Sequence, residues 1–166
     1  MGPVTRCLGN EIPPAQDWQN PLPAPPPPSS LPDFSAVKSA IRNITPPEGY
    51  GYEFPARLIR LAYQCASTFR VTDYLGGCNG ARIRFTPQKD WPENVALETV
   101  LSLLQPIKDS FKNLSWADLI VLAGNTALES AGALNVTLPF CGGRTDAVTG
   151  SMVDVHLAPR ITGDWG

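Results

Sequence analysis

A proline-rich segment near the N-terminus limits what this chain can fold into. Nine of the twenty residues from Pro13 to Pro32 are proline. Each proline fixes φ and lacks a backbone N–H, so the segment cannot join a helix interior or a central strand, and polyproline II is its natural conformation. Trp18 and Leu22 give it apolar side chains suited to docking on a groove, although a flexible linker is the alternative. We predict an extended arm over residues 1–32 and a folded domain over residues 33–166.

The first part of the folded domain has the patterns of three helices. Asp33 is a suitable N-cap for a helix over residues 34–43. Apolar residues at helical spacing predict a second helix over residues 56–70 and a third over residues 95–112. Pro106 predicts a kink within the third helix.

A fourth helix has both a start and a stop in the sequence. Ser115 and Asp118 form the S-x-x-D pattern of a capping box, and the apolar run that follows suits a buried helix. Gly132 is placed to end it. Residues 135–166 predict loop with at most short turns, and the chain shows no internal repeat. The expected fold is therefore all-α, about four helices with long loops.

The predicted second helix has two unlike faces. One face carries an apolar stripe at three- and four-residue spacing: Leu58, Leu61, Ala62, Cys65 and Phe69. The other places a guanidinium, a phenol, a carboxamide and a hydroxyl on one line: Arg60, Tyr63, Gln64 and Ser67. The glycine-rich turn over residues 76–80 then permits positive φ and close approach of another group. Chemistry alone leaves open whether the polar line is a site or a solvated helix face.

Composition argues against two classes of partner. Thirteen basic and fifteen acidic residues give a net charge of −2, so we expect no nucleic-acid surface. No run approaches the ~18 apolar residues that cross a bilayer.

The first residues lack the apolar core of a signal peptide, so we interpret the chain as a mature form, a fragment or a protein made without such a peptide. At 166 residues it is one domain at most.

Cysteines and glycosylation motifs bear on the compartment. Three N-x-[ST] motifs predict glycosylation sites at Asn43, Asn113 and Asn135, all near expected element boundaries. Four cysteines allow three disulfide pairings, and four reduced thiols in a cytosolic protein are the alternative.

Five blocks of sequence carry a resemblance to a known family. They are R-L-A-Y-Q-C-A-S-T-F-R, G-G-C-N-G-A-R-I-R-F, W-P-E-N-V-A-L, L-S-W-A-D-L-I-V-L-A-G-N-T-A-L-E-S and G-R-T-D, between Phe54 and about Ala147. In order and spacing they resemble the distal lobe of the class I haem peroxidases, closest to catalase-peroxidases. The resemblance implies half of a haem-peroxidase fold. In that family haem b lies between this lobe and a second lobe that supplies a proximal histidine. His156, the single histidine, lacks the family's glycine-rich approach, so we interpret it as a surface loop residue.

The resemblance also implies roles for individual residues. Arg60 matches the distal arginine that polarises peroxide. Gln64 occupies the place of the distal histidine, but a carboxamide cannot act as the general base. Tyr63 replaces the distal tryptophan, and Asn94 matches the asparagine that orients the missing histidine. We therefore expect a degenerate site with no catalytic residue.

Disulfide pairing is implied by a related group. Secretory plant peroxidases join the same helix to the same turn, which implies a bridge from Cys65 to Cys78 here. Cys7 in the arm would then pair with Cys141 and tie the arm to the body.

Two functions are compatible with these features. Our main hypothesis is a non-catalytic, secreted, self-assembling glycoprotein that takes no cofactor or metal and serves as a matrix, wall or surface-filament subunit. Its partners would be other copies joined through the arm, or another protein covering the haem-side face. The alternative is the distal fragment of a haem-dependent peroxidase or catalase-peroxidase acting on hydrogen peroxide.

Overall fold

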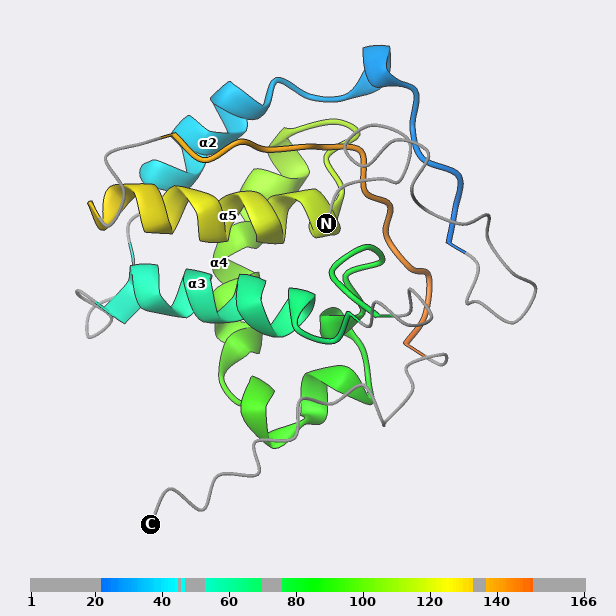
Figure 1. The fold of residues 1–166 in the computed structure, drawn as a ribbon, viewed down its shortest axis with the longest axis vertical. Coiled ribbons are helices and arrows are strands. Elements are labelled where there is room, and N and C mark those ends of the chain that lie inside the picture. The colour runs from blue at the N-terminus through cyan, green and yellow to red at the C-terminus, as the bar shows by residue number, and fades with distance from the viewer. Residues whose placement is uncertain (1–21, 45, 47–52, 70–75, 133–136, 151–166) are drawn as a thin grey trace.

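The computed structural model describes residues 22–44, 46, 53–69, 76–132 and 137–150 (Figure 1). Four α-helices form this part: α2 (Phe34–Arg42), α3 (Glu53–Ala66), α4 (Leu97–Ser110) and α5 (Trp116–Ser130). Four 3-10 turns accompany them: η2 (Pro28–Ser30) precedes α2, and η3 (Arg82–Arg84), η4 (Gln88–Asp90) and η5 (Pro92–Asn94) lie between α3 and α4. The described residues contain no strand, only an isolated bridge between Gly80 and Asp146. The all-α prediction is confirmed.

Local sequence patterns account for the start of α2. Asp33 caps the helix, since its side chain accepts a hydrogen bond of 2.9 Å from the backbone N–H of Ser35. Val37 and Ile41 are buried on its inner side. The predicted helix over residues 34–43 is therefore present, one residue shorter at its end.

The second and third helices differ from the prediction at their ends. α3 begins at Glu53, three residues earlier than expected, because Pro55 lies in the first turn, where a missing N–H breaks no helical hydrogen bond. α4 continues across Pro106, and the kink stays a prediction.

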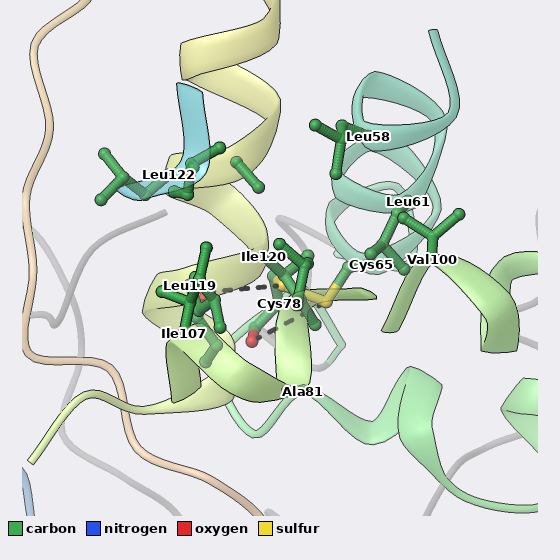
Figure 2. Close-up of a cluster of buried hydrophobic side chains, with 14 of the residues drawn as sticks. Leu58, Leu61, Cys65, Cys78, Ala81, Val100, Ile107, Leu119, Ile120 and Leu122 are labelled. Carbon is green, nitrogen blue, oxygen red and sulfur yellow. Dashed lines mark hydrogen bonds between the residues drawn. A yellow bond between two sulfur atoms is a disulfide. The ribbon is translucent and has the colours of Figure 1, made fainter. Parts of the chain in front are cut away.

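α5 is the centre of the core. It packs mainly against α3 and also against α2, while α4 crosses behind them (Figure 1). Nine of its fifteen residues are buried. Leu119, Ile120 and Leu122 of α5 lie in the same cluster as Leu58 and Leu61 of α3 (Figure 2). The two helices approach closely, because a Cβ added at Gly124 would lie 2.4 Å from the Cβ of Ala62.

The described part of the arm lies on the folded domain. Backbone angles near φ −61°, ψ 147° at Pro27 and φ −69°, ψ 148° at Leu31 are those of polyproline II. The side-chain amide of Asn113 donates to the carbonyl of Ser30 at 2.9 Å, and Leu22 lies beside Gly80. Trp18 lies outside the described residues. Among the helices described, none is long and apolar enough to span a membrane.

Candidate functional site

The polar line of α3 is partly buried. Arg60 is exposed and Tyr63 is 63% exposed, but Gln64 is only 7% exposed. Of the two alternatives left open for this line, the solvated helix face does not describe Gln64. η3 and η5 both pack against α3, and helical periodicity cannot reveal contacts with turns that lie farther along the chain.

Arg60 connects α3 to η5. Its Nη2 donates a hydrogen bond of 2.6 Å to the carbonyl oxygen of Glu93. Asn94, the next residue, is 3% exposed, and its Nδ2 donates to the carbonyl of Gln88 at 2.6 Å. The structure thus brings Asn94 to the helix that carries Arg60 and Gln64, as the resemblance implies. Sequence reasoning missed Glu93, because the contact uses a backbone atom that any residue type would supply.

Two buried oxygens at this site have no hydrogen-bond partner among the protein groups that the structure describes. They are Oε1 of Gln64 and Oδ1 of Asn94. A buried acceptor left without a donor costs about 1–3 kcal/mol. Such atoms in a native structure require an explanation, such as a bound molecule or a functional role.

A disulfide fixes the end of α3 next to Gln64. Cys65 and Cys78, both 1% exposed, are joined at 2.06 Å (Figure 2). This is the pairing that the resemblance implies. Cys141 is also disulfide-bonded, while Cys7, its expected partner, lies outside the described residues.

The glycine turn approaches the end of α3 closely. Gly76 has φ +77°, and a Cβ there would lie 2.0 Å from the carbonyl oxygen of Thr68. Thr68 in turn accepts a hydrogen bond from the N–H of Gly77 at 2.8 Å. A residue with a side chain would therefore displace the turn from α3, as the glycine cluster predicts.

The G-R-T-D block holds α5 in place. Ser115 caps α5, because its Oγ accepts from the N–H of Asp118 at 3.0 Å. Asp118 does not complete a capping box. It instead accepts hydrogen bonds from the N–H of Gly143 at 2.6 Å and from Nη1 of Arg144 at 2.9 Å. The capping-box prediction is thus wrong for Asp118, because buried Arg144 offers a charged partner that the local pattern does not contain.

Asp146 of the same block performs a second structural role. Its two carboxylate oxygens accept from the N–H groups of Trp116 and Ala117 at 2.9 and 3.0 Å, at the N-terminus of α5. Burial lowers the pKa of the nearby Arg84 guanidinium, and the charge of Asp146 opposes that shift. The block therefore supports the site through α5.

The predicted glycosylation sites and the single histidine are only partly covered by the described residues. Asn43 and Asn113 are exposed, as a glycan would require, whereas Asn135 and His156 lie outside the described residues. Glycosylation of all three asparagines stays a prediction. Within the described part of the chain, no three His, Cys, Asp or Glu side chains gather as a metal site.

Comparisons with known proteins agree on one family. Residues 35–164 match the family described as peroxidase. The chain is 42% identical to "Catalase-peroxidase 2" of Mycolicibacterium smegmatis, over 98% of this chain and 23% of that protein. It is 43% identical to "Catalase-peroxidase" of Klebsiella pneumoniae and 42% identical to "Catalase-peroxidase" of Yersinia pestis, in each case over 89% of this chain. The chain spans 20–23% of the length of these relatives.

These matches overturn one expectation. We expected a protein that takes no cofactor, because Gln64 replaces the distal base and no proximal histidine was recognised. The peroxidase match and the catalase-peroxidase relatives imply haem, so that expectation is wrong. Replacing the distal base by Gln64 removes a proton-transfer step of the reaction. It does not by itself prevent haem binding, because haem is held by many contacts.

Proposed function

This chain belongs to the peroxidase family, and from that membership we propose that it supplies the distal half of a haem pocket in a protein that acts on hydrogen peroxide. The contact between Arg60 and Glu93 carries the proposal, because it joins the two elements that bear Gln64 and Asn94. Those are the positions at which the resemblance places the distal residues.

The exposed side of α3 is compatible with a porphyrin. Tyr63 is 63% exposed and Val95, directly after Asn94, is 65% exposed. Val95 directly follows η5, which packs against α3, and a contiguous exposed apolar surface favours a binding face. Arg60, Tyr63 and Gln64 would meet the distal side of the haem. Bound haem would supply the redox chemistry of peroxide reduction.

The protein's own groups permit part of that chemistry. The Arg60 guanidinium has further N–H groups besides the one given to Glu93, and these can stabilise negative charge on an oxygen ligand. The Gln64 carboxamide cannot accept a proton near neutral pH. We therefore propose that the site binds peroxide and cleaves it slowly.

In this proposal a ligand for the haem iron would come from a second lobe. Haem iron in peroxidases is held by a proximal histidine, and His156 is the single histidine of this sequence. We propose that a second, proximal lobe supplies the ligand, since the relatives are four to five times longer than the aligned region.

The second candidate function is the secreted, self-assembling module without catalysis. The Cys65–Cys78 disulfide and the disulfide-bonded Cys141 support it, because disulfides persist in oxidising compartments. Gln64 in place of the base supports it as well. In this proposal the arm, or the arm of another copy, covers the face that bears Tyr63.

Haem titration tests the main proposal on the purified chain. Excess imidazole is added to replace the axial histidine, and the Soret absorption is followed. We expect saturable binding that Arg60→Gln weakens and that Lys112→Gln, which removes an exposed cation after α4, leaves unchanged. Absence of a saturable band, or equal loss in both variants, would contradict the proposal.

Restoring the base tests the assigned role of Gln64. In the haem-loaded chain with imidazole, Gln64→His should raise the rate of peroxide-dependent oxidation of a phenol about 100-fold, the lower end for a positioned general base. Gln105→His, on the exposed side of α4, is the control. Equal rates in the two variants would show that position 64 does not face the reacting oxygen.

Deleting residues 1–32 tests the second candidate. Solution mass should fall from that of an assembly to that of a monomer on deletion. A full-length protein that is already monomeric, with an equally soluble monomeric truncation, would exclude assembly through the arm.

A further inference from the structure

We propose that Arg82 forms a binding site for a carboxylate group, next to the described part of the arm. The site uses none of the residues assigned above to the haem pocket. It therefore stands or fails independently of the proposed function.

The guanidinium of Arg82 has no partner among the described residues. Its Nε is buried and makes no hydrogen bond. Burial lowers the pKa of this guanidinium, and no acidic side chain in the described part of the chain opposes that shift. Arginine stays protonated even so, which leaves a partly buried positive charge without a counter-charge. Such a group requires an explanation.

Arg84, at the other end of η3, shows how an arginine is satisfied in this region. Its Nε donates to the carbonyl of Ala81 at 3.0 Å, and its Nη2 donates to the carbonyl of Ala147 at 3.3 Å. The charge of Asp146 opposes the lowering of its pKa. Arg84 thus engages both carbonyl oxygens and has a counter-charge nearby, whereas Arg82 has neither.

Gly80 holds the Arg82 guanidinium in place. A Cβ added at Gly80 would lie 2.8 Å from Nη1 of Arg82. The same point lies 3.1 Å from Cδ2 of Leu22 and 3.5 Å from Cβ of Ala147. The guanidinium therefore lies against bare backbone, with one apolar side chain from the arm and one from the segment after α5 beside it. Apolar neighbours exclude water, and this strengthens a charge-assisted hydrogen bond.

A carboxylate satisfies both the unpaired N–H and the unpaired charge. It only accepts hydrogen bonds, and its two oxygens match the planar fork of an arginine. A water molecule or an amide would satisfy the N–H and leave the charge without a partner. Val148, directly after Ala147, is 82% exposed, so apolar surface continues beside the site. This surface favours a carboxylate on a carbon chain over a small inorganic anion.

The carboxylate has two possible sources. One is a free organic acid, and the other is an acidic side chain of this protein outside the described residues: Glu11, Asp17, Asp154 or Asp164. Both flanking segments of the chain start near η3. The described chain begins at Leu22, beside Gly80, and it ends at Gly150, where an added Cβ would lie 2.6 Å from Cβ of Phe85. The chemistry at Arg82 is the same for either source.

Acetate and acetamide provide a matched test, since they share size and shape and only acetate is charged. We would titrate each into the purified chain that carries four substitutions: Glu11→Gln, Asp17→Asn, Asp154→Asn and Asp164→Asn. The Nε–H resonance of Arg82 is followed by NMR and is assigned by its loss in Arg82→Lys. Acetate should shift it to saturation with an affinity about tenfold above that of acetamide, because hydrogen bonds between charged groups are stronger.

Arg57 provides the internal control. It already pairs with Glu53 at 3.1 Å on the surface of α3, so its Nε–H resonance should not show saturable acetate binding.

Comparison with the wild-type chain identifies the source. If one of its own carboxylates occupies the site, the wild type should bind acetate at least about fivefold more weakly than the variant with four substitutions. The pair Glu11→Gln and Asp17→Asn, and the pair Asp154→Asn and Asp164→Asn, then show which segment supplies the group. Equal affinity in the wild type and the variant indicates a free acid. Either result supports a carboxylate site at Arg82.

Two results in the variant with four substitutions would overturn the proposal. One is an Arg82 resonance that shows no saturable response to acetate, or responds equally to acetate and acetamide, because a neutral group such as water would then satisfy Nε. The other is an equal response to acetate at Arg57, which would mean that acetate acts only by general charge screening.

Discussion

Glu129 of α5 joins three parts of the chain at one carboxylate. It accepts from Lys38 of α2 at 2.5 Å and from Arg42 of α2 at 3.1 Å. It also accepts from the N–H of Leu138, beyond α5, at 2.8 Å. Its side chain is 8% exposed. The hydrogen bond from Lys38 is the main cause that lowers the pKa of Glu129, and desolvation opposes it.

We predict that Glu129→Gln destabilises the fold by about 2 kcal/mol at neutral pH, because the partly buried ammonium of Lys38 loses its charged partner. The folded-state pKa lies below the ordinary value of 4.5. The stabilisation is therefore present above about pH 4.5 and is lost as pH falls through the lowered pKa. Urea unfolding of both proteins from pH 7 to pH 3 measures it.

The control for that prediction is Glu53→Gln. Glu53 pairs with Arg57 across one turn, and its side chain is 71% exposed, so the loss should stay below about 1 kcal/mol. A Glu129→Gln protein that keeps the wild-type difference in stability between pH 7 and pH 3 would contradict the assigned linkage.

Single residues were predictable where the cause lies nearby in the sequence. Asp33 and Ser115 cap helices as expected, because a cap acts within three residues. The burial of Gln64 was left open by its pattern, and the local pattern gave Asp118 the wrong partner. α3 packs against η3 and η5, and Asp118 pairs with Arg144; these partners are distant in sequence, and neither periodicity nor a capping pattern contains that information.

At the level of elements, the crossing of α3 and α5 depends on two small residues. A Cβ on Gly124 would lie 2.4 Å from Cβ of Ala62 and 3.7 Å from the carbonyl oxygen of Leu58. Real Cβ atoms do not approach so closely, so a larger residue at either position must separate the helices. Glycine inside a helix is otherwise unfavourable by about 1 kcal/mol relative to alanine.

We predict that Gly124→Ala destabilises the protein by about 1–3 kcal/mol, because overpacking exceeds the gain in helix propensity. The exchange Ala62→Gly with Gly124→Ala should recover most of the loss, since it restores one methyl group at the crossing. Thermal unfolding of the two single variants and the double variant gives the coupling energy. Additive effects of the two changes would show that the helices do not meet there.

The helices themselves were recoverable from sequence, but their arrangement was not. Amphipathic stripes and caps predicted all four helices, with errors of a few residues at both ends of α3 and α4. The small pair at Ala62 and Gly124 was not predicted, because a glycine in an apolar run has no local reason that the sequence displays. The resemblance to a family, and not the helical periodicity, predicted that Arg60 and Asn94 belong to one site.

At the scale of the whole molecule, the arm and the turn between α4 and α5 are connected. Asn113 has φ +61°, a left-handed conformation that asparagine tolerates. Leu114 is buried, and Ser115 caps α5. Each residue of this N-L-S motif therefore has a structural use. The motif at Asn113 is therefore weaker support for glycosylation than its pattern suggests. The side chain of Asn113 also contacts the arm at Ser30.

We predict that Asn113→Asp releases the arm. The Asn113 Nδ2 donates to the carbonyl of Ser30 at 2.9 Å, whereas an aspartate would place a carboxylate against that carbonyl. Aspartate tolerates the same left-handed backbone, so the turn itself should persist. Loss of a net hydrogen bond, plus repulsion, should increase the open population of the arm about fivefold or more. Hydrogen exchange at the Ser30 and Leu31 amides, which bond to Pro27 and Pro28, reports that population.

Asn43→Asp is the matched control for the arm. Asn43 is also an exposed asparagine in an N-x-[ST] motif, but it lies at the end of α2. Exchange at Ser30 and Leu31 should therefore stay at the wild-type rate in this variant. If both variants accelerate exchange equally, added negative charge rather than the Asn113 contact controls the arm. If neither variant accelerates exchange, other contacts, such as that of Leu22 beside Gly80, hold the arm on the domain. The hydrogen bond of Asn113 would then not be what retains the arm.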